Sequence, residues 1–269
     1  MHFRLGRTWR RGDNVAETFE RPVPACYREH VTRHSIRVAH TGAAGQVYDD
    51  VLAIRGEVYG LAPEKRPEPS DAHSELYCAY WEGRPVGTIR TTRSVQGPLD
   101  CEEHFPPGLV ADLRPQLCSS SRLCMLRDVP TGLNIPRLLI EVQFLHVVQE
   151  LGVRLDLIAV HQRALRYYTR LGYCVLGDSF FLHPFRNAPC HVMGFPVDAR
   201  RLNPLSHLYK DIKDPLSIET LQRYARIISV EDARSEQRSP GAASIRTDDS
   251  TDVPSQIRDE RTTRPQESA

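Results

Sequence analysis

The sequence predicts a mixed α/β fold in which a central sheet is flanked by helices. Residues 154–177 carry the strongest signal, because an apolar run is followed by a helix-forming stretch, a glycine and a second apolar run, typical of strand, helix and strand. Residues 136–151 place apolar side chains on a broad helical face, which favours packing against a sheet. Residues 75–81 and 85–91 are short strands separated by turn residues, as in a hairpin.

The remaining elements follow in chain order. Residues 35–40 are expected to form a strand and residues 46–59 a helix, since apolar residues recur there at helical spacing and Gly60 provides a C-terminal cap. A third strand is expected at about residues 121–126, after a Pro-rich loop. The later elements are a strand, a short helix, one or two final strands and a C-terminal helix, at residues 155–160, 162–171, 180–197 and 218–228.

Composition divides the chain into three parts. Residues 1–33 are polar and Arg-rich, which predicts an extension, and residues 34–230 carry the pattern of a folded domain. Residues 231–269 contain few large apolar side chains, so they cannot bury enough surface to offset the entropy of ordering and are expected to be disordered.

Charge and cysteine spacing narrow the function classes. A formal net charge of +1 gives no reason to expect a nucleic-acid partner. The seven cysteines form no Cys-x-x-Cys pair, so no metal site is expected. The N-terminus lacks the apolar core of a signal peptide and no run is long enough for a membrane span, which makes the cytoplasm the expected compartment.

Several short motifs resemble, in order, those of two related enzyme families. The stretch Tyr167-Tyr-Thr-Arg-Leu-Gly-Tyr173 resembles the last third of a GCN5-related N-acetyltransferase (GNAT) fold. The upstream motifs resemble those of the N-acyl amino acid synthases and the acyl-homoserine-lactone (autoinducer) synthases; they are Arg55-Gly-Glu-Val-Tyr59, Gly87-Thr-Ile-Arg90, Gly97-Pro-Leu followed by His104-Phe-Pro, and Ser121-Arg122-Leu.

The details of these motifs favour the N-acyl amino acid synthases. The Gly87-Thr-Ile-Arg90 motif and the Tyr-x-x-x-Gly-aromatic helix end are closer to that family. The resemblance implies a GNAT fold and transfer of a long-chain acyl group from acyl carrier protein to the α-amine of an amino acid. It also implies no permanently bound cofactor, because the acyl-phosphopantetheine thioester is a co-substrate. Acyl-coenzyme A remains an alternative donor.

The resemblance also indicates which residues carry the chemistry. Tyr168 corresponds to a tyrosine that can protonate the leaving thiolate in GNAT enzymes, a task suited to a neutral donor of high pKa. The alternative is that Tyr167 or Tyr168 only packs the helix on the sheet. The family motif Glu-x-Ser-Arg aligns with Ser119-Ser-Ser-Arg122, so its acidic residue is a serine here. Asp71, Glu75 or a water relay are then expected to take the proton of the attacking amine. His161 is either a further proton carrier or a helix cap.

Substrate contacts are expected from the other motif positions. Arg55, Arg90 and Arg122, with Tyr59 beside them, are expected to form an electrostatic cluster that orients acids and binds the carboxylate of the acceptor. The alternative is that the arginines are surface residues or a structural ion-pair network. The thioester is expected in a splay between the strand near 122–126 and the strand at 155–160. A set of apolar residues either lines an acyl tunnel or forms a plain core: Leu123, Met125, Leu139, Val142, Phe144 and Leu157.

The expected pantetheine-phosphate loop departs from the usual GNAT pattern. In Arg127-Asp-Val-Pro-Thr-Gly-Leu-Asn-Ile-Pro only Gly132 of the usual glycines remains, and Pro130 removes one backbone donor. Arg127, Gly132 and Arg137 are the expected contacts, and a weakened cradle suits the single phosphate of a carrier protein. Acidic carrier proteins need a basic surface, for which the candidates are Arg4, Arg7, Arg10, Arg11, Arg127, Arg137 and Arg163.

The sequence leaves three other functions open. They are a lactone synthase acting on S-adenosylmethionine, an acetyl-coenzyme A N-acetyltransferase acting on a small amine, and a catalytically degenerate protein that binds an acyl ligand as a sensor. The serine at position 119 is the observation that keeps the sensor open.

Overall fold

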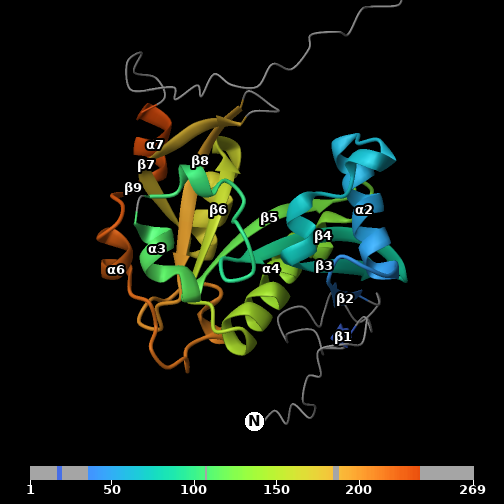
Figure 1. Ribbon diagram of the computed structural model, residues 1–269, viewed down its shortest axis with the longest axis horizontal. Coiled ribbons are helices and arrows are strands. Elements are labelled where there is room, and N and C mark those ends of the chain that lie inside the picture. The colour runs from blue at the N-terminus through green and yellow to red at the C-terminus, as the bar shows by residue number, and fades with distance from the viewer. Residues whose placement is uncertain (1–16, 20–35, 107, 184–187, 237–269) are drawn as a thin grey trace, which may run out of the picture.

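The computed structural model describes residues 17–19, 36–106, 108–183 and 188–236. Within these residues nine strands form one mixed sheet in the order β1-β2-β3-β4-β5-β6-β8-β7-β9 (Figure 1). Neighbouring strands are antiparallel except for the pair β5 and β6, which is parallel. The sheet is thus two antiparallel halves joined by one parallel pair, and with its flanking helices it confirms the predicted α/β class.

The two halves follow each other along the chain. The first half contains β1 (Glu17–Phe19), β2 (Ile36–Thr41), β3 (Ser74–Trp81), β4 (Arg84–Arg93) and β5 (Leu117–Met125). The second half contains β6 (Leu155–His161), β7 (Cys174–His183), β8 (Ala188–Pro196) and β9 (Ile227–Ile228). The β3–β4 hairpin turns at Glu82 and Gly83, whose φ angles of 52° and 81° are typical of a two-residue turn. Arg84, which the sequence prediction placed in the turn, begins β4.

Two helices cover opposite faces of the first half. The hydroxyl of Tyr80 in β3 donates to Asp50 of α2 (Gln46–Tyr59) at 2.6 Å. Tyr77 lies three residues earlier, on the opposite face of the strand, and contacts His146 directly after α4 (Ile135–Leu145). The other helices are α5 (Leu165–Leu171), which follows β6, and the short helices α3 (Leu109–Leu113), α6 (Ile218–Gln222) and α7 (Val230–Glu236) around the second half.

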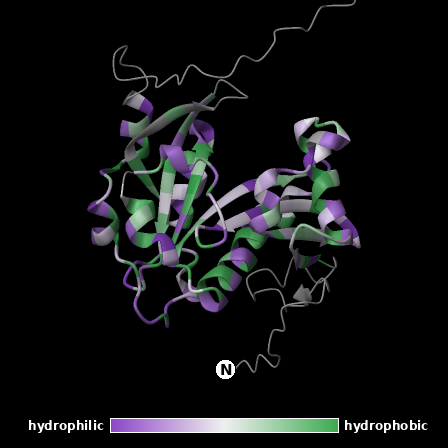
Figure 2. Ribbon diagram, in the orientation of Figure 1, coloured by the Kyte–Doolittle hydropathy of each residue, from purple (hydrophilic) through white to green (hydrophobic). Residues whose placement is uncertain are grey.

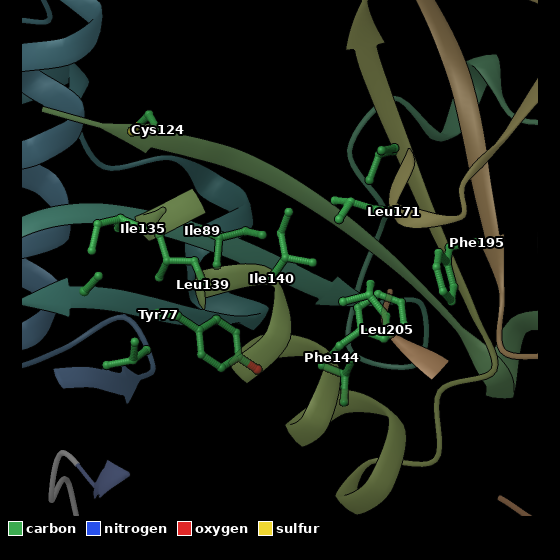
Figure 3. Close-up of a cluster of buried hydrophobic side chains, with 14 of the residues drawn as sticks. Tyr77, Ile89, Cys124, Ile135, Leu139, Ile140, Phe144, Leu171, Phe195 and Leu205 are labelled. Carbon is green, nitrogen blue, oxygen red and sulfur yellow. The ribbon is translucent and has the colours of Figure 1, made fainter. Parts of the chain in front are cut away.

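The main hydrophobic core lies behind the sheet, where α4 bridges the two halves. Much of α4 and the strands around β6 carry hydrophobic residues, whereas the outer loops are mainly hydrophilic (Figure 2). Phe144 of α4 is fully buried and packs edge-on against Phe195 of β8, with ring centroids 4.6 Å apart. Leu139 and Ile140 pack toward the first half, beside Ile89 (Figure 3). This packing fixes the position of β6 relative to β5 from behind.

Three boundaries differ from the sequence prediction. The expected helix 218–228 ends at Gln222, because Ile227 and Ile228 pair with Val175 and Leu176 of β7. β-branched residues beside an open sheet edge gain more from pairing than from continuing a short helix. The predicted tail begins too early, since α7 extends to Glu236, and the predicted N-terminal extension contributes β1. Residues 237–269 and most of 1–33 lie outside the described residues.

The helix expected over 136–151 also changes character. After α4 the chain continues as a π-helical turn, His146–Glu150, before Gly152 adopts a left-handed conformation. π-helical turns are rare and insert one extra residue per turn. Among the described residues, no helix is long and apolar enough to cross a bilayer.

The π-helical turn places His146 in a buried polar contact with β3. Its Nδ1 is 2.7 Å from the hydroxyl of Tyr77, and its ring lies edge-on to His40, with centroids 4.7 Å apart. Burial, together with the charge of His40, lowers the pKa of His146 to about 4, although the nearby Glu75 acts in the opposite direction. His146 is therefore neutral in the folded protein near pH 7.

This contact predicts a pH-dependent stability. The pKa of His146 is 6.5 in the unfolded chain and about 4 in the folded protein. The contribution of the neutral histidine to stability is therefore fully present above pH 6.5. It is lost as the pH falls toward 4, because the unfolded chain binds the proton first. We expect the His146→Asn variant, which keeps an acceptor near Nδ1, to lose less unfolding free energy between pH 6.5 and pH 4 than the wild type. Urea titrations across this range measure both slopes, and equal slopes would contradict the prediction.

Candidate active site

The feature that defines the site is the divergence of β5 and β6. The two strands pair only where Leu117–Ser119 meets Leu155–Leu157. Beyond that point, residues 120–125 of β5 and residues 158–161 of β6 separate, and no pairing between them is present among the described residues (Figure 1). We call this opening the splay. It lies where the sequence predicted one, and the two strands do not satisfy each other's backbone groups along it.

A β-bulge at Arg122 shapes the β5 side of the splay. Thr88 pairs with Cys124 and Arg90 with Ser121, so Ile89 alone faces two residues of β5. Arg122 has a φ of 55°, in the left-handed region that non-glycine residues rarely adopt. The extra residue turns the Arg122 side chain onto the face of Arg90, whereas simple alternation after Ser121 would send it to the other face.

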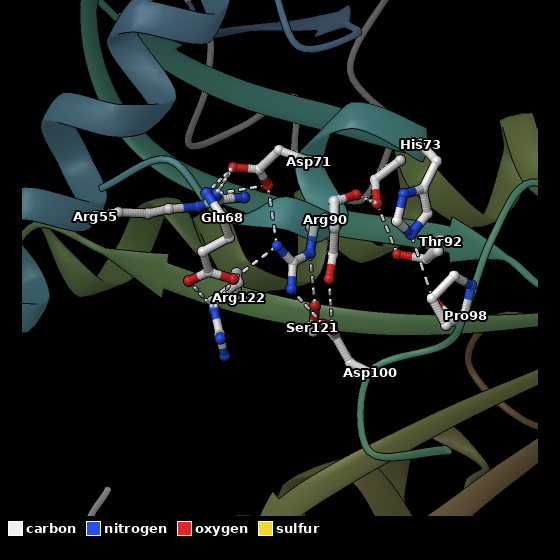
Figure 4. A network of polar contacts seen from close by, with 12 residues as sticks. Arg55, Glu68, Asp71, His73, Arg90, Thr92, Pro98, Asp100, Ser121 and Arg122 are labelled. Atoms are coloured by element: carbon white, nitrogen blue, oxygen red, sulfur yellow. Dashed lines mark hydrogen bonds and ion pairs between the residues drawn. The ribbon is translucent and has the colours of Figure 1, made fainter. Parts of the chain in front are cut away.

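An ion-pair cluster lies between α2 and this face of the sheet (Figure 4). It joins three arginines with three acids: Arg55, Arg90, Arg122, Glu68, Asp71 and Asp100. The structure thus brings together the three arginines that the sequence singled out, and their charges are balanced by the acids. We refer to these six residues as the ion-pair cluster.

Asp71 is the central acid of the cluster. Its two oxygens accept hydrogen bonds from Arg55 Nη1 at 2.8 and 2.9 Å, and Oδ1 also accepts one from Arg90 Nη1 at 3.0 Å. The Tyr48 hydroxyl and the backbone N–H of Glu68 donate to Oδ2 at 3.3 and 3.0 Å. Burial by itself raises the pKa of Asp71, but the charge and hydrogen bonds of Arg55 outweigh it and lower the pKa. This environment favours a positioning role over the predicted role as a proton acceptor.

The structure places Glu75, the other predicted proton acceptor, on the opposite face of the sheet. It shares the face of Tyr77, and its Oε2 lies 2.6 Å from His40 Nε2 while Oε1 accepts a hydrogen bond from Gln96 at 3.2 Å. Burial raises its pKa, but the hydrogen bond and charge of His40 lower it to about 2. The structure therefore separates Glu75 from Asp71, and its proposed catalytic role stays a prediction that this geometry does not favour.

Two acids that sequence reasoning missed complete the cluster. Glu68 accepts hydrogen bonds from Arg90 Nη1 at 2.7 Å and from Arg122 Nε at 2.7 and 2.9 Å. Asp100 pairs with Arg90 Nη2 and hydrogen-bonds the Ser121 side chain. Their side chains remain 20% and 19% exposed, whereas Asp71 is 1% exposed. Both stand in irregular Pro-containing loops, where residue spacing gives no sign of what a side chain contacts.

Tyr168 lies beside the splay on the β6 side. Tyr168 packs against the main core, and its ring centroid lies 5.4 Å from that of Tyr173. Tyr59, at the end of α2, is close enough to contribute to the raised pKa of Tyr168. The hydroxyl of Tyr59 hydrogen-bonds the thiol of Cys124 on β5. Burial, with the charges of Tyr167 and Asp156, raises the pKa of Tyr168 above its ordinary value. Tyr168 is therefore a neutral hydroxyl donor at physiological pH.

His161 acts as a helix cap in the structure. Its Nδ1 accepts a hydrogen bond from the backbone N–H of Arg163 at 3.0 Å, at the start of the turn that leads into α5. This is one of the two roles that the sequence left open, and the catalytic one stays a prediction.

The predicted apolar residues divide into two groups. Leu123 and Met125 are half-buried on the β5 side of the splay, as is Val142 on α4. Leu139 and Phe144 are fully buried in the main hydrophobic core, whereas Leu157 is fully buried in a second core cluster. The first group is thus partly open to solvent, and the second is closed to it.

The predicted phosphate loop leads from β5 into the N-terminus of α4. Arg127 and Gly132 are exposed, and a side chain at Gly132 would meet no other atom within 4 Å. Asn134 is in a left-handed conformation directly before the helix. Arg137 in the first turn donates from Nε to Glu141 at 2.8 Å. The structure thus places the three predicted phosphate contacts at one end of α4, but Arg137 is engaged by an acid.

A buried acid lies at the closed end of the splay. Asp156 of β6 accepts hydrogen bonds from the Tyr173 hydroxyl at 2.6 Å and the Ser120 hydroxyl at 2.9 Å, and contacts the Cys118 thiol at 3.2 Å. Burial raises its pKa to about 6, although these hydrogen bonds lower it. The signal in the sequence was a single aspartate inside an apolar strand. Among the described residues, no group of three His, Cys, Asp or Glu side chains is arranged to hold a metal ion.

The ion-pair cluster predicts an unequal cost of breaking ion pairs. Asp71→Ala leaves Arg55 buried without its acid, and we expect a loss of about 3–5 kcal/mol of unfolding free energy. Arg84→Ala, which removes an exposed ion pair with Asp128, serves as the control and is expected to have little measurable effect. Chemical denaturation measures both, and a small loss for Asp71→Ala would show that the cluster does not hold α2 on the sheet.

Comparison with solved structures finds acyltransferases to which this chain is similar over nearly their whole length. FeeM, an N-acyl amino acid synthase from uncultured soil microbes, is 17% identical over 65% of this chain and 99% of that chain, with a TM-score of 0.46. The coenzyme A-dependent acyl-homoserine lactone synthase BjaI is 15% identical over 69% of this chain and 96% of that chain, at 0.47. An acyl-CoA N-acyltransferase from Pseudomonas aeruginosa is 14% identical over 60% and 99%, at 0.45.

A family model gives the assignment. No curated protein sequence matches the chain. The model for N-acyl amino acid synthase FeeM matches residues 50–196, more than half of the 269 residues. The matched range contains the whole ion-pair cluster, both sides of the splay and Tyr168. The chain therefore belongs to the N-acyl amino acid synthase FeeM family and is an N-acyltransferase.

Proposed function

We propose that the protein transfers a long-chain acyl group from acyl carrier protein to the α-amine of an amino acid. The observation that carries this proposal is the splay, bordered on one side by a cluster of three arginines and on the other by a neutral, partly buried tyrosine. Membership of the FeeM family supports the same reaction. The folded unit that performs it is the domain that begins near residue 34, with the N-terminal residues and the tail as extensions.

The donor thioester is proposed to lie in the splay. A backbone N–H of β5 that β6 leaves unpaired would donate to the thioester carbonyl and stabilise the negative charge that develops on its oxygen as the amine attacks. Tyr168, which its raised pKa keeps protonated, would hydrogen-bond the sulfur and donate its proton to the departing thiolate, and the proton that the attacking amine releases would restore the tyrosine. The acyl chain would run along Leu123 and Met125 toward the core.

The acceptor is proposed to lie on the α2 side of the splay, beside the ion-pair cluster. The cluster presents guanidinium groups to a carboxylate, a geometry that suits an amino acid better than a plain amine. The amine must lose a proton during attack. Glu68 and Asp100 are the partly exposed acids of the cluster, and we assign them the role of receiving this proton through water, in place of Asp71 and Glu75.

The carrier protein is proposed to dock near the phosphate loop. Arg127 of this loop is exposed, and Arg137 is partly exposed but paired with Glu141. Arg163, in the turn after β6, is exposed as well. An acidic carrier would be attracted to these positive charges. The arginines at positions 4, 7, 10 and 11, which the sequence also indicated, lie outside the described residues.

The product identifies the function directly. We expect mass spectrometry to detect an N-acyl amino acid after the protein is mixed with long-chain acyl carrier protein and pooled amino acids plus S-adenosylmethionine. A lactone product would identify a signalling synthase instead. Turnover of acetyl-coenzyme A with a small amine would indicate an ordinary acetyltransferase. Saturable acyl binding with no product in any arm would leave a ligand-binding protein and refute the enzyme proposal.

Tyr168 has a matched control in its neighbour Tyr167. Tyr168→Phe removes only the hydroxyl, and we expect kcat to fall roughly 100-fold with little change in KM for the amino acid, because general acid catalysis acts in the transition state. Tyr167 is 37% exposed, and Tyr167→Phe is expected to leave kcat within about twofold of the wild type, as is usual for a surface substitution. Steady-state kinetics with acyl carrier protein measures both. Equal rates for the two variants would exclude Tyr168 as the proton donor.

A further inference from the structure

Arg55 has an unusual set of partners for a fully buried arginine. Its side chain is 0% exposed, and Nη1 alone binds Asp71, with hydrogen bonds to both oxygens. Its Nε and Nη2 are also buried, and no acceptor among the described residues is within hydrogen-bonding distance of either. A charged N–H group that is buried without an acceptor is costly, so an arginine held in this state is unlike the other members of the ion-pair cluster.

The two unpaired nitrogens form one recognition edge. Nε and Nη2 lie side by side on the guanidinium and point their N–H groups in the same direction, which matches the two oxygens of a carboxylate. Because Asp71 holds Nη1 on the opposite side, the guanidinium is already fixed in orientation and would lose little entropy on binding.

The surroundings of this edge also point to a ligand. Thr88 lies on β4 two residues before Arg90, on the face covered by α2, and its hydroxyl is likewise buried without a partner among the described residues. Cys124 pairs with Thr88 across the β4–β5 ladder. Burial raises the pKa of Cys124, and the charge of Arg55 acts in the opposite direction, which places the guanidinium near the β5 side of the splay. Tyr59 follows Arg55 by one helical turn and hydrogen-bonds the Cys124 thiol.

We propose that the inner edge of Arg55, with the Thr88 hydroxyl, binds the α-carboxylate of the acceptor amino acid. This inference rests on the proposed acyltransferase function. The carboxylate enters from the splay, past the hydrogen bond between Tyr59 and Cys124, and its two oxygens accept hydrogen bonds from Nε and Nη2. The amine of the same molecule then remains on the splay side, facing the thioester.

The alternative receptor within the cluster is Arg122. Its Nε is bound to Glu68, and its two terminal nitrogens have no partner among the described residues. Its side chain is 33% exposed, however, so water satisfies those nitrogens at little cost. The Arg55 edge is shielded from solvent, where a charge-assisted bond is stronger and a missing partner is more costly. Binding of the acceptor carboxylate at Arg55 and binding at Arg122 therefore predict opposite effects when either arginine is substituted.

The test compares an amino acid with the amine that it yields on decarboxylation. The wild type is expected to acylate the amino acid with a higher kcat/KM than the amine. Arg55→Lys keeps the positive charge but removes the two-pronged edge, and we expect the ratio of the two kcat/KM values to fall roughly 10- to 100-fold. Thr88→Val is expected to lower the ratio roughly 2- to 10-fold, as for one neutral hydrogen bond. Arg122→Lys is expected to change the ratio less than twofold.

Other outcomes separate this proposal from the proposed function. An unchanged ratio in Arg55→Lys with a collapsed ratio in Arg122→Lys would move the carboxylate to Arg122 and overturn the inference. An equal loss for both acceptors in Arg55→Lys would show that Arg55 has only a structural role. If Arg55→Lys lacks a cooperative thermal transition, the ratio of the two kcat/KM values in Thr88→Val tests the inference instead. A fall in this ratio supports the inference, and an unchanged ratio refutes it. If the wild type makes no product, the proposed function fails, and thermal-shift titrations then test the inference on carboxylate binding. The inference is supported if the amino acid, but not the amine, stabilises the wild type and if this stabilisation is absent in Thr88→Val. It is refuted if the amino acid and the amine have the same effect.

Discussion

The carboxylate of Asp71 is the contact on which the architecture of the site depends. It accepts hydrogen bonds from Arg55 on α2 and from Arg90 on β4, so one acid ties the helix to the sheet at the point where β5 begins to diverge from β6. None of the three side chains is more than 1% exposed, and a charge removed from water in this way must keep its partners. The position of α2, and with it the α2 side of the splay, therefore depends on this carboxylate.

The bulge at Arg122 adds the third arginine to this arrangement. One extra residue in β5 turns Arg122 onto the face that α2 covers, where Glu68 binds it. The same irregularity lies on the part of β5 that β6 leaves unpaired, so the position of Arg122 and the opening of the sheet share a local origin. A left-handed backbone at a non-glycine residue is unfavourable in isolation, and the bonds between Arg122 and Glu68 help to offset it.

Much of the fold was predictable because its signals are local. The bounds of α2 follow from apolar spacing and from Gly60, and the β3–β4 hairpin follows from its turn residues. The helical turn around Tyr168, closed by Gly172, was equally clear. The bulge, the strand β9 and the contacts of Glu68 and Asp100 were not predictable, because each depends on residues distant in sequence. A helix propensity at 218–228 could not reveal that β7 offers a free edge to Ile227 and Ile228.

The serine at position 119 shows how the cluster tolerates a change at a motif position. Ser119 is buried opposite Thr92, on the same face as Ser121 and two residues before it, so an acidic side chain there would point toward Arg90. In this chain Asp100 reaches the same region from a loop, pairing with Arg90 and hydrogen-bonding Ser121. Arg90 thus keeps its acids although the strand does not supply one. Because the contribution of a carboxylate depends on its position and not on the element that carries it, the loss at position 119 is compatible with an active enzyme.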